Sequence, residues 1–365
     1  MNKKRLFIII SVIYVLIALI LKPRHDYWSY LDQWGRVVSD GDINNPYGIS
    51  YNLFAYISNL PLIQFPRAIF VVVYLVAAYE IWVLAANLKS SYLDIIFVVL
   101  LFNPLFIVFG LLYGSNDAFL SGITAISVFY FINKKYSLAG ILMAIAIGFK
   151  FSPLFILPFF ILKDYRINKI YAISFFISAL LIILLGYSMW GDSILHPFDL
   201  GVNRESKSLS IFRFIRGSIR PCSFFGIDDL DSYSIWLLIV GFLISFLLFF
   251  YYKLDYLIMA LFSYTNAMIF FKIGHHQFYF LMLLLSAIVF IKNENKIIEN
   301  RGLFISFLLF WLWFFVLVIL YYFTAYQDGY SYIREVVGLP NTVFLLVFNL
   351  FLLKLAFLTQ RLSRL

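Results

Sequence analysis

Ten long apolar runs dominate the sequence and leave few ways for this chain to fold. They extend over residues 6–21, 67–86, 94–112, 118–132, 170–185, 234–252, 256–271, 278–291, 303–322 and 343–358. Several contain the ~17–25 residues that a helix needs to cross the hydrocarbon of a bilayer, and the others need flanking residues to do so. Residues 138–162 hold two shorter apolar pieces, split by Lys150 and Pro153, which predict a short hairpin that enters the membrane and returns.

The scarcity of charge excludes a soluble protein. Only 13% of the 365 residues are charged and 63% are hydrophobic, whereas a soluble domain has about 25% charged residues. The same composition excludes a disordered or collagen-like chain. The sequence therefore predicts an all-α, polytopic transmembrane helical bundle with about ten full spans plus the short hairpin, built as a single domain over residues 1–365.

The net charge of +9 reflects the orientation of the chain in the membrane and does not indicate a nucleic-acid-binding surface. With the N-terminus placed in the cytoplasm, sixteen of the 28 Lys and Arg residues and six of the 19 acids fall on the cytoplasmic side, a net +10. The other side carries a net −1. An excess of bases in short loops on one side is the positive-inside pattern, so both termini are expected in the cytoplasm and no nucleic acid is expected as a partner.

Polar residues concentrate in two long outer loops, residues 22–66 and 190–233, which we expect to form the active-site face. After Asp26, aromatic and aliphatic residues recur at helical spacing through Val38. This pattern predicts an amphipathic helix lying in the membrane interface. Asp26 stands where the first span gives way to this helix, so it is either the N-cap of the helix or a carboxylate with a chemical role.

Two further outer segments carry charge beside turn residues. Asp117 follows the turn Gly114-Ser115-Asn116 and either caps the next helix or serves a site. Lys150 lies at the tip of the predicted hairpin. A lysine at depth is costly when it is unpaired, so Lys150 must either meet an anion or extend outward to water.

Basic residues gather at two places in the second half of the chain. Lys272, His275 and His276 lie at an outer junction between spans, where they suit either phosphate contact or a structural hydrogen bond. Adjacent histidines on a helix point about 100° apart, so we expect no metal there. In the second outer loop, Arg213, Arg216 and Arg220 are interleaved with apolar residues, which suits the phosphate of a lipid carrier or ordinary anionic headgroups.

Three stretches resemble the GT-C superfamily of multi-span glycosyltransferases that use lipid-phosphate sugars. They are closest to glycosylphosphatidylinositol mannosyltransferase I and to bacterial polyprenyl-phosphate-mannose-dependent mannosyltransferases. The first stretch is Asp26-Tyr27 with Gly41 and Asn45-Pro46-Tyr47, and the second runs from Asn103-Pro104 through Gly114–Asp117 to Lys150 and Pro153. The third is Lys272 with Gln277-Phe278-Tyr279. Arg24 stands where the family often has a first aspartate, so a metal held by two carboxylates is not supported. No other cofactor is expected.

This resemblance implies an outward-facing, inverting glycosyltransferase that takes a sugar from a polyprenyl-phosphate donor to a lipid or glycan acceptor. Asp26 would be the base, and Asp117 would orient the acceptor or hold a cation in place. The donor phosphate would contact Lys150, Lys272, His275 and His276, with Arg213, Arg216 and Arg220 as a second set. The absence of glycosylation sequons and of a retention signal favours a bacterial inner membrane.

Two other functions are compatible with a chain of this kind. A polysaccharide repeat-unit polymerase also has many spans and an arginine-rich outer loop, but no arginine of the second outer loop is followed eleven residues later by the glycine that such enzymes often carry. A lipid-linked sugar transporter or flippase would favour charge at mid-membrane and internal repeats, and no repeat is found here.

Overall fold

The computed structural model describes residues 3–22, 26–58, 65–197, 200, 209–216, 233–326 and 336–363, and within these ranges the chain forms helices and connections without any strand. This confirms the all-α prediction. Each of the ten apolar runs lies on a helix or, for residues 94–112, on a pair of helices. Because apolar surroundings supply no hydrogen-bond partners for the backbone, a helix that satisfies its own groups is the expected outcome for such runs.

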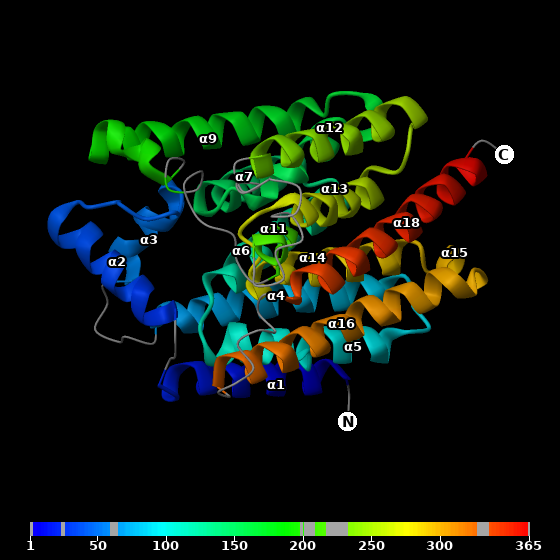
Figure 1. The fold of residues 1–365 in the computed structure, drawn as a ribbon, viewed down its shortest axis with the longest axis horizontal. Helices are drawn as coiled ribbons and strands as arrows, with labels where there is room; N and C mark the ends of the chain where they lie inside the picture. Colours follow the sequence, from blue (N-terminus) through cyan, green and yellow to red (C-terminus); the bar gives the residue numbers. More distant parts are fainter. Residues whose placement is uncertain are drawn as a thin grey trace. The chain divides into compact units, whose positions relative to one another are not determined.

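The chain divides into two compact units, which are described separately. Unit 1 comprises residues 1–154 and 168–202, and unit 2 comprises residues 155–167 and 203–365. The helices of unit 1 are α1 (Lys3–Ile20), α2 (Asp26–Asp40), α3 (Ile49–Ser58), α4 (Phe65–Asn87), α5 (Leu93–Leu101), the π-helix η1 (Phe106–Leu112), α6 (Asn116–Ile132), α7 (Tyr136–Phe149) and α9 (Lys169–Trp190) (Figure 1). Those of unit 2 are α8 (Leu157–Ile161), α11 (Ile211–Arg216), α12 (Ser234–Tyr252), α13 (Tyr256–Phe270), α14 (Tyr279–Lys292), α15 (Glu294–Glu299), α16 (Arg301–Tyr326) and α18 (Gly338–Ser363).

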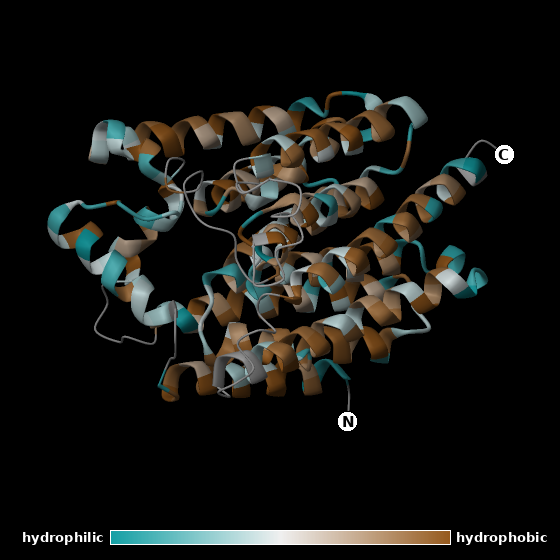
Figure 2. Cartoon of the chain, in the orientation of Figure 1, coloured by the Kyte–Doolittle hydropathy of each residue, from teal (hydrophilic) through white to brown (hydrophobic). Residues whose placement is uncertain are grey.

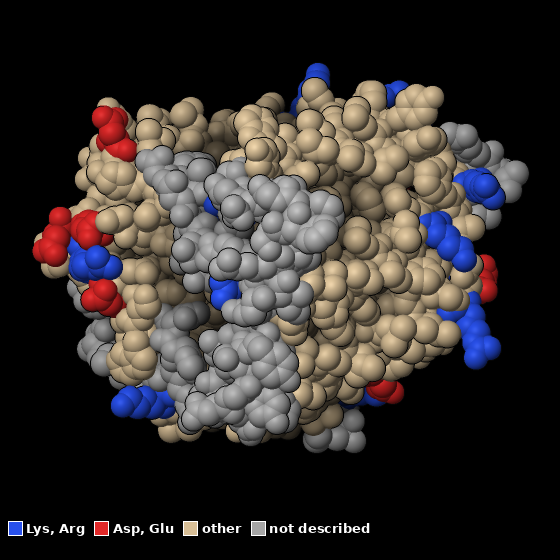
Figure 3. Space-filling view, in the orientation of Figure 1, with Lys and Arg blue, Asp and Glu red and all other residues tan. Residues whose placement is uncertain are grey.

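Several of these helices could span a membrane. Five described helices are long and apolar enough: α4, α9 with its 3-10 extension, α12, α16 and α18. The bent pair α5 and η1 makes a sixth candidate. Figure 2 shows hydrophobic residues along most of α9 and α12, and most of the described surface in Figure 3 carries no charged side chain. These features are consistent with an integral membrane protein, whereas the predicted number of ten full spans is not confirmed.

Small residues let α7 and α9 pack closely in unit 1. Gly140, Ala144 and Gly148 recur every four residues along α7. A Cβ atom on Gly140 would lie 2.6 Å from the carbonyl oxygen of Tyr171 in α9. The two backbones can approach because the glycine has no side chain, as is common between helices in membranes.

The bend between α5 and η1 has a chemical cause. Pro104 has no N–H, so the carbonyl of Leu100 loses its helical partner. The hydroxyl of Tyr74 donates to that carbonyl at 3.0 Å, and the hydroxyl of Tyr14 donates to the carbonyl of Leu101 at 3.0 Å. Two tyrosines from neighbouring helices thus stabilise a 44° break within an apolar run.

The predicted amphipathic helix is present as α2, but its apolar face does not lie in the headgroups. Tyr27, Tyr30, Trp34 and Val37 are at most 2% exposed, because they pack into a cluster with residues of α3, α4, α6 and α7. Helical periodicity shows that a face is buried without showing what buries it. Trp28, on the other side of α2, is exposed.

Unit 2 is built around two helices that are buried on all sides. From Leu257 to Ile269 every residue of α13 is buried, and so is every residue of α14 from Tyr279 to Ile291. Asp255 caps α13, its carboxylate accepting from the backbone N–H groups of Leu257 and Ile258. Burial raises the pKa of this carboxyl, against the lowering effect of these hydrogen bonds.

We expect Gly140→Ala to destabilise the protein by about 1–3 kcal/mol, because the added methyl group would force α7 and α9 apart. Gly35→Ala is the matched control, since a Cβ on this α2 glycine meets nothing within 4 Å and alanine is the better helix former by about 1 kcal/mol. Thermal unfolding of the purified protein in detergent measures both. Equal melting temperatures for the two variants would contradict the close packing of α7 and α9.

Candidate functional site

Four motif segments, spread over residues 26–150, come together at one end of unit 1. The first pair is the turn Asn45–Gly48 and the end of α7. The backbone N–H of Gly48 donates to the carbonyl of Phe149 at 3.1 Å. A Cβ on Gly48 would overlap the carbonyl oxygen of Gly148, so the two backbones touch with no side chain between them.

The second pair is the start of α2 and the turn that precedes α6. Gly114 has a φ of +67°, a conformation that favours glycine. A Cβ at this position would lie 2.9 Å from the ring of Tyr27 and 2.8 Å from the side chain of Arg67. The start of α2 therefore packs against the turn that leads to Asp117.

An ion pair joins the segment of Asp117 to that of Lys150. The ammonium of Lys150 donates to both carboxylate oxygens of Asp117, at 2.7 and 2.9 Å. The Asp117 side chain is 1% exposed and that of Lys150 is 17% exposed. The Lys150 ammonium also lies 5.8 Å from the centre of the Tyr47 ring. The anion that a lysine at this depth requires is thus supplied by the protein itself.

Asp117 is not the N-cap of α6. That position belongs to Ser115, whose hydroxyl accepts from the backbone N–H of Asp117 at 3.2 Å. The carboxylate of Asp117 is consequently directed to Lys150. Beside it, the side-chain amide of Asn116 is fully buried and has no hydrogen-bond partner among the described residues. A buried amide without a partner is costly, so this end of unit 1 keeps an unsatisfied polar group next to its ion pair.

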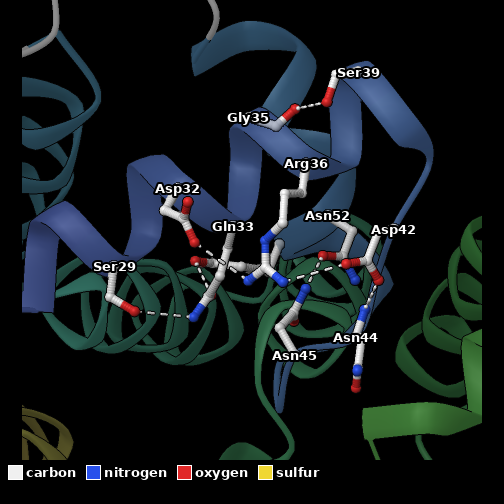
Figure 4. A network of polar contacts seen from close by, with 11 residues as sticks. Ser29, Asp32, Gln33, Gly35, Arg36, Ser39, Asp42, Asn44, Asn45 and Asn52 are labelled. Atoms are coloured by element: carbon white, nitrogen blue, oxygen red, sulfur yellow. Dashed lines mark hydrogen bonds and ion pairs between the residues drawn. The ribbon is translucent and has the colours of Figure 1, made fainter.

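A network of polar contacts holds the first outer loop in place (Figure 4). The Asn45 amide donates to the side chain of Asn52 at 2.8 Å, and the Asn45 oxygen accepts from the backbone N–H of Tyr47 at 3.0 Å. Arg36 pairs with Asp32 and with Asp42, each at 3.3 Å. These contacts fix the turn that places Tyr47 beside Lys150.

Asp26, the predicted base, is the first residue of α2. Its side chain lies outside the described part of the structure. The backbone of Asp26 adjoins Tyr27, which contacts Gly114 as described above. The candidate base and the pair of Asp117 and Lys150 therefore belong to segments that contact one another.

The other predicted residues belong to unit 2. The junction between α13 and α14 carries Lys272 and His275, both half-buried, and His276, which is buried with its ring 4.9 Å from that of Tyr321. Within the described residues, no group of three or more His, Cys, Asp or Glu residues is arranged to hold a metal.

The segment that begins α11 is anchored to this junction through its backbone. The N–H of Leu209 donates to the carbonyl of Gly274 at 3.1 Å, and the Asn341 amide donates to the carbonyl of Leu209 at 3.0 Å. Arg213 is half-buried in α11. The side chain of Arg216 and the whole of Arg220 lie outside the described residues.

Arg67 was not singled out in the sequence, although it contacts both segments that flank the candidate acids. It is fully buried, and its guanidinium donates to the carbonyls of Ala18, Leu21 and Leu112. The only signal was its place directly after Pro66 at the start of an apolar run, where it resembles an ordinary outer base.

Comparison with known proteins adds no further assignment: no protein-family model and no curated protein matches the chain.

We expect Lys150→Met to cost about 3–5 kcal/mol of stability, because it leaves a buried carboxylate unpaired. Asp117→Asn costs less, since the more exposed Lys150 can turn to water, and the double variant costs less than the two single changes together. Lys3→Met is the control: Lys3 pairs with Asp94 at 2.5 Å with both side chains exposed, and such pairs contribute at most about 1 kcal/mol. Chemical denaturation in detergent measures all four variants. Additive effects of the two single changes would show that the pair contributes no coupling.

Proposed function

We propose that the protein is a membrane glycosyltransferase of the GT-C kind. It would transfer a sugar from a polyprenyl-phosphate donor to a lipid or glycan acceptor, with inversion at the anomeric carbon. The observation that carries the proposal is the convergence of the Asp26, Asn45–Gly48, Gly114–Asp117 and Lys150 segments. These segments belong to the first two of the three stretches that carry the resemblance, and they meet although they are spread over residues 26–150 of the chain.

The reaction requires a base for the acceptor hydroxyl. A carboxylate that is ionised near neutral pH takes the proton as the hydroxyl oxygen attacks the anomeric carbon. We assign this role to Asp26, at the junction between α1 and the outer helix α2. The bond from the anomeric carbon to the phosphate oxygen breaks, and the polyprenyl phosphate leaves with the electron pair.

The leaving phosphate must be stabilised as its charge develops. Preorganised cations do this best, and Lys150 is held in place by Asp117 and Tyr47. We assign Lys150 to the donor phosphate and Asp117 to orienting the acceptor. On the resemblance we also assign phosphate contact to Lys272, His275 and His276, and to Arg213, Arg216 and Arg220 of the second outer loop.

The distribution of charge sets the orientation, and the absence of glycosylation sequons in the sequence favours a bacterial membrane. We place the protein in a bacterial inner membrane with both termini in the cytoplasm and the site on the periplasmic side. No nucleotide-binding glycine loop occurs in the sequence, which agrees with a lipid-linked donor. Membrane lipids surround the long apolar helices.

A second candidate function is transport of a lipid-linked sugar without covalent chemistry. The broken span formed by α5 and η1 favours it, because interrupted helices form the binding sites of many transporters. The buried Asn103 at this break keeps a side-chain N–H group without a partner among the described residues. A transporter would return its sugar-lipid unchanged.

One assay separates the candidates. The purified protein, reconstituted in vesicles, is incubated with radiolabelled polyprenyl-phosphate mannose or other polyprenyl-phosphate hexoses and with a lipid-extract acceptor. Transfer of a single sugar is the expected result. Movement of the labelled lipid between leaflets without a covalent product would establish the transporter, and transfer of whole repeat units would establish a polymerase.

We expect Asp26→Asn to abolish sugar transfer, because the amide cannot accept the acceptor's proton. Expression and membrane insertion should remain near normal. Asp40→Asn is the matched control, since Asp40 is exposed at the opposite end of the same helix, and it should transfer at the wild-type rate. An unaltered rate for purified Asp26→Asn would remove Asp26 as the base.

A further inference from the structure

Arg67 is a buried cation whose guanidinium donates hydrogen bonds to backbone carbonyls. Its side chain is fully buried at the start of α4. Among the described residues, the acceptors of its guanidinium are all backbone carbonyls. Nε donates to Ala18 at 2.9 Å, Nη1 donates to Leu112 at 3.4 Å, and Nη2 donates to both Ala18 and Leu21.

These carbonyls belong to two different helix ends. Ala18 and Leu21 lie at the C-terminal end of α1, and Leu112 is the last residue of η1. The final carbonyls of a helix have no partner within the helix and carry partial negative charge. A guanidinium offers five N–H groups in a planar fork, whereas a lysine offers a single ammonium at one point. One arginine can therefore satisfy both helix ends where lysine cannot.

The guanidinium of Arg67 and the two helix ends that it binds form a clamp. The backbone of Arg67 adds a third element to this clamp. Its N–H donates to the hydroxyl oxygen of Tyr27 at 3.2 Å. Burial raises the pKa of the Tyr27 phenol, so this hydroxyl stays protonated. The side chains of Arg67 and Tyr27 together form the surface against which Gly114 packs.

We infer that Arg67 is a positioning residue that sets the start of α2, and with it Asp26, against the turn leading to Asp117. Tyr27 directly follows Asp26, and Gly114 precedes Asp117 by three residues. The link to catalysis rests on the proposed function, in which Asp26 is the base. The clamp itself is a property of the fold and can be tested without any activity.

The clamp is tested by thiol protection. In a Cys222→Ser background, the single variant Ala18→Cys places a fully buried thiol at the α1 end of the clamp, and Val37→Cys places one at the far end of α2. Reaction with N-ethylmaleimide is followed with Arg67 in place and after Arg67→Lys. We expect Arg67→Lys to make the thiol at position 18 reactive while the thiol at position 37 stays protected, which shows a local release and not unfolding.

Transfer kinetics test the positioning role. For Arg67→Lys we expect kcat to fall about tenfold or more with KM within about twofold, because a small displacement of a base costs rate without costing donor binding. Arg5→Lys, at an exposed arginine of α1, should leave both constants unchanged. If Arg67→Lys does not fold, Tyr27→Phe removes the hydroxyl that accepts from the Arg67 N–H group and should lower kcat several-fold.

The thiol reaction and the transfer kinetics can contradict the clamp and the positioning role independently. Equal protection of the thiol at position 18 with and without Arg67→Lys would overturn the clamp, whatever the activity. A reactive thiol at that position together with an unchanged kcat would overturn the positioning role. If the wild-type protein transfers no sugar, the proposed function fails and the clamp is decided by the thiol reaction alone.

Discussion

In unit 1, side chains from other helices donate hydrogen bonds to the free backbone carbonyls at helix ends and breaks. An apolar surrounding offers a terminal carbonyl no water, so each such group needs a donor from within the protein. Arg67 serves the ends of α1 and η1, and Tyr14 and Tyr74 serve the break at Pro104. Because these donors lie on α1 and α4, the packing of the bundle and the completion of its helices depend on each other. The candidate site lies in unit 1 beside the helix ends that Arg67 completes.

The same need for hydrogen-bond partners explains why the polar residues of unit 1 occupy well-defined positions in a largely apolar chain. Asn45 and Asn52 close the turn of the first outer loop, Ser115 caps α6, and Asp117 balances Lys150. Among the exceptions, the side-chain N–H of Asn103 and the side-chain amide of Asn116 are buried and have no partner among the described residues. Asn116 adjoins the buried ion pair of Asp117 and Lys150. A bound substrate would gain most there, because its own groups would replace the missing partner.

The helices could be predicted from the sequence because burial of an apolar run in lipid or protein leaves the backbone no other regular structure. The pairing of Lys150 with Asp117 could not, since the two residues lie far apart in the chain; only the need of such a lysine for an anion was evident. The periodicity of α2 predicted its apolar face, but it could not distinguish a protein core from lipid headgroups as the surface that covers Trp34. Arg67 was missed for a related reason. Its partners are backbone carbonyls, which every residue has, so no residue type in the sequence indicates them.

The contact between Gly48 and Gly148 gives unit 1 a mechanical property. Two backbones that touch directly, joined by the hydrogen bond from Gly48 to Phe149, have no side-chain rotamers with which to absorb a displacement. A shift at the end of α7 therefore acts directly on the backbone of the first outer loop. Tyr47 directly precedes Gly48, and Lys150 follows Gly148 closely in the chain, so the backbones of the two residues are coupled through this contact. A ligand that shifts the backbone at the end of α7 would therefore displace the turn that carries Tyr47.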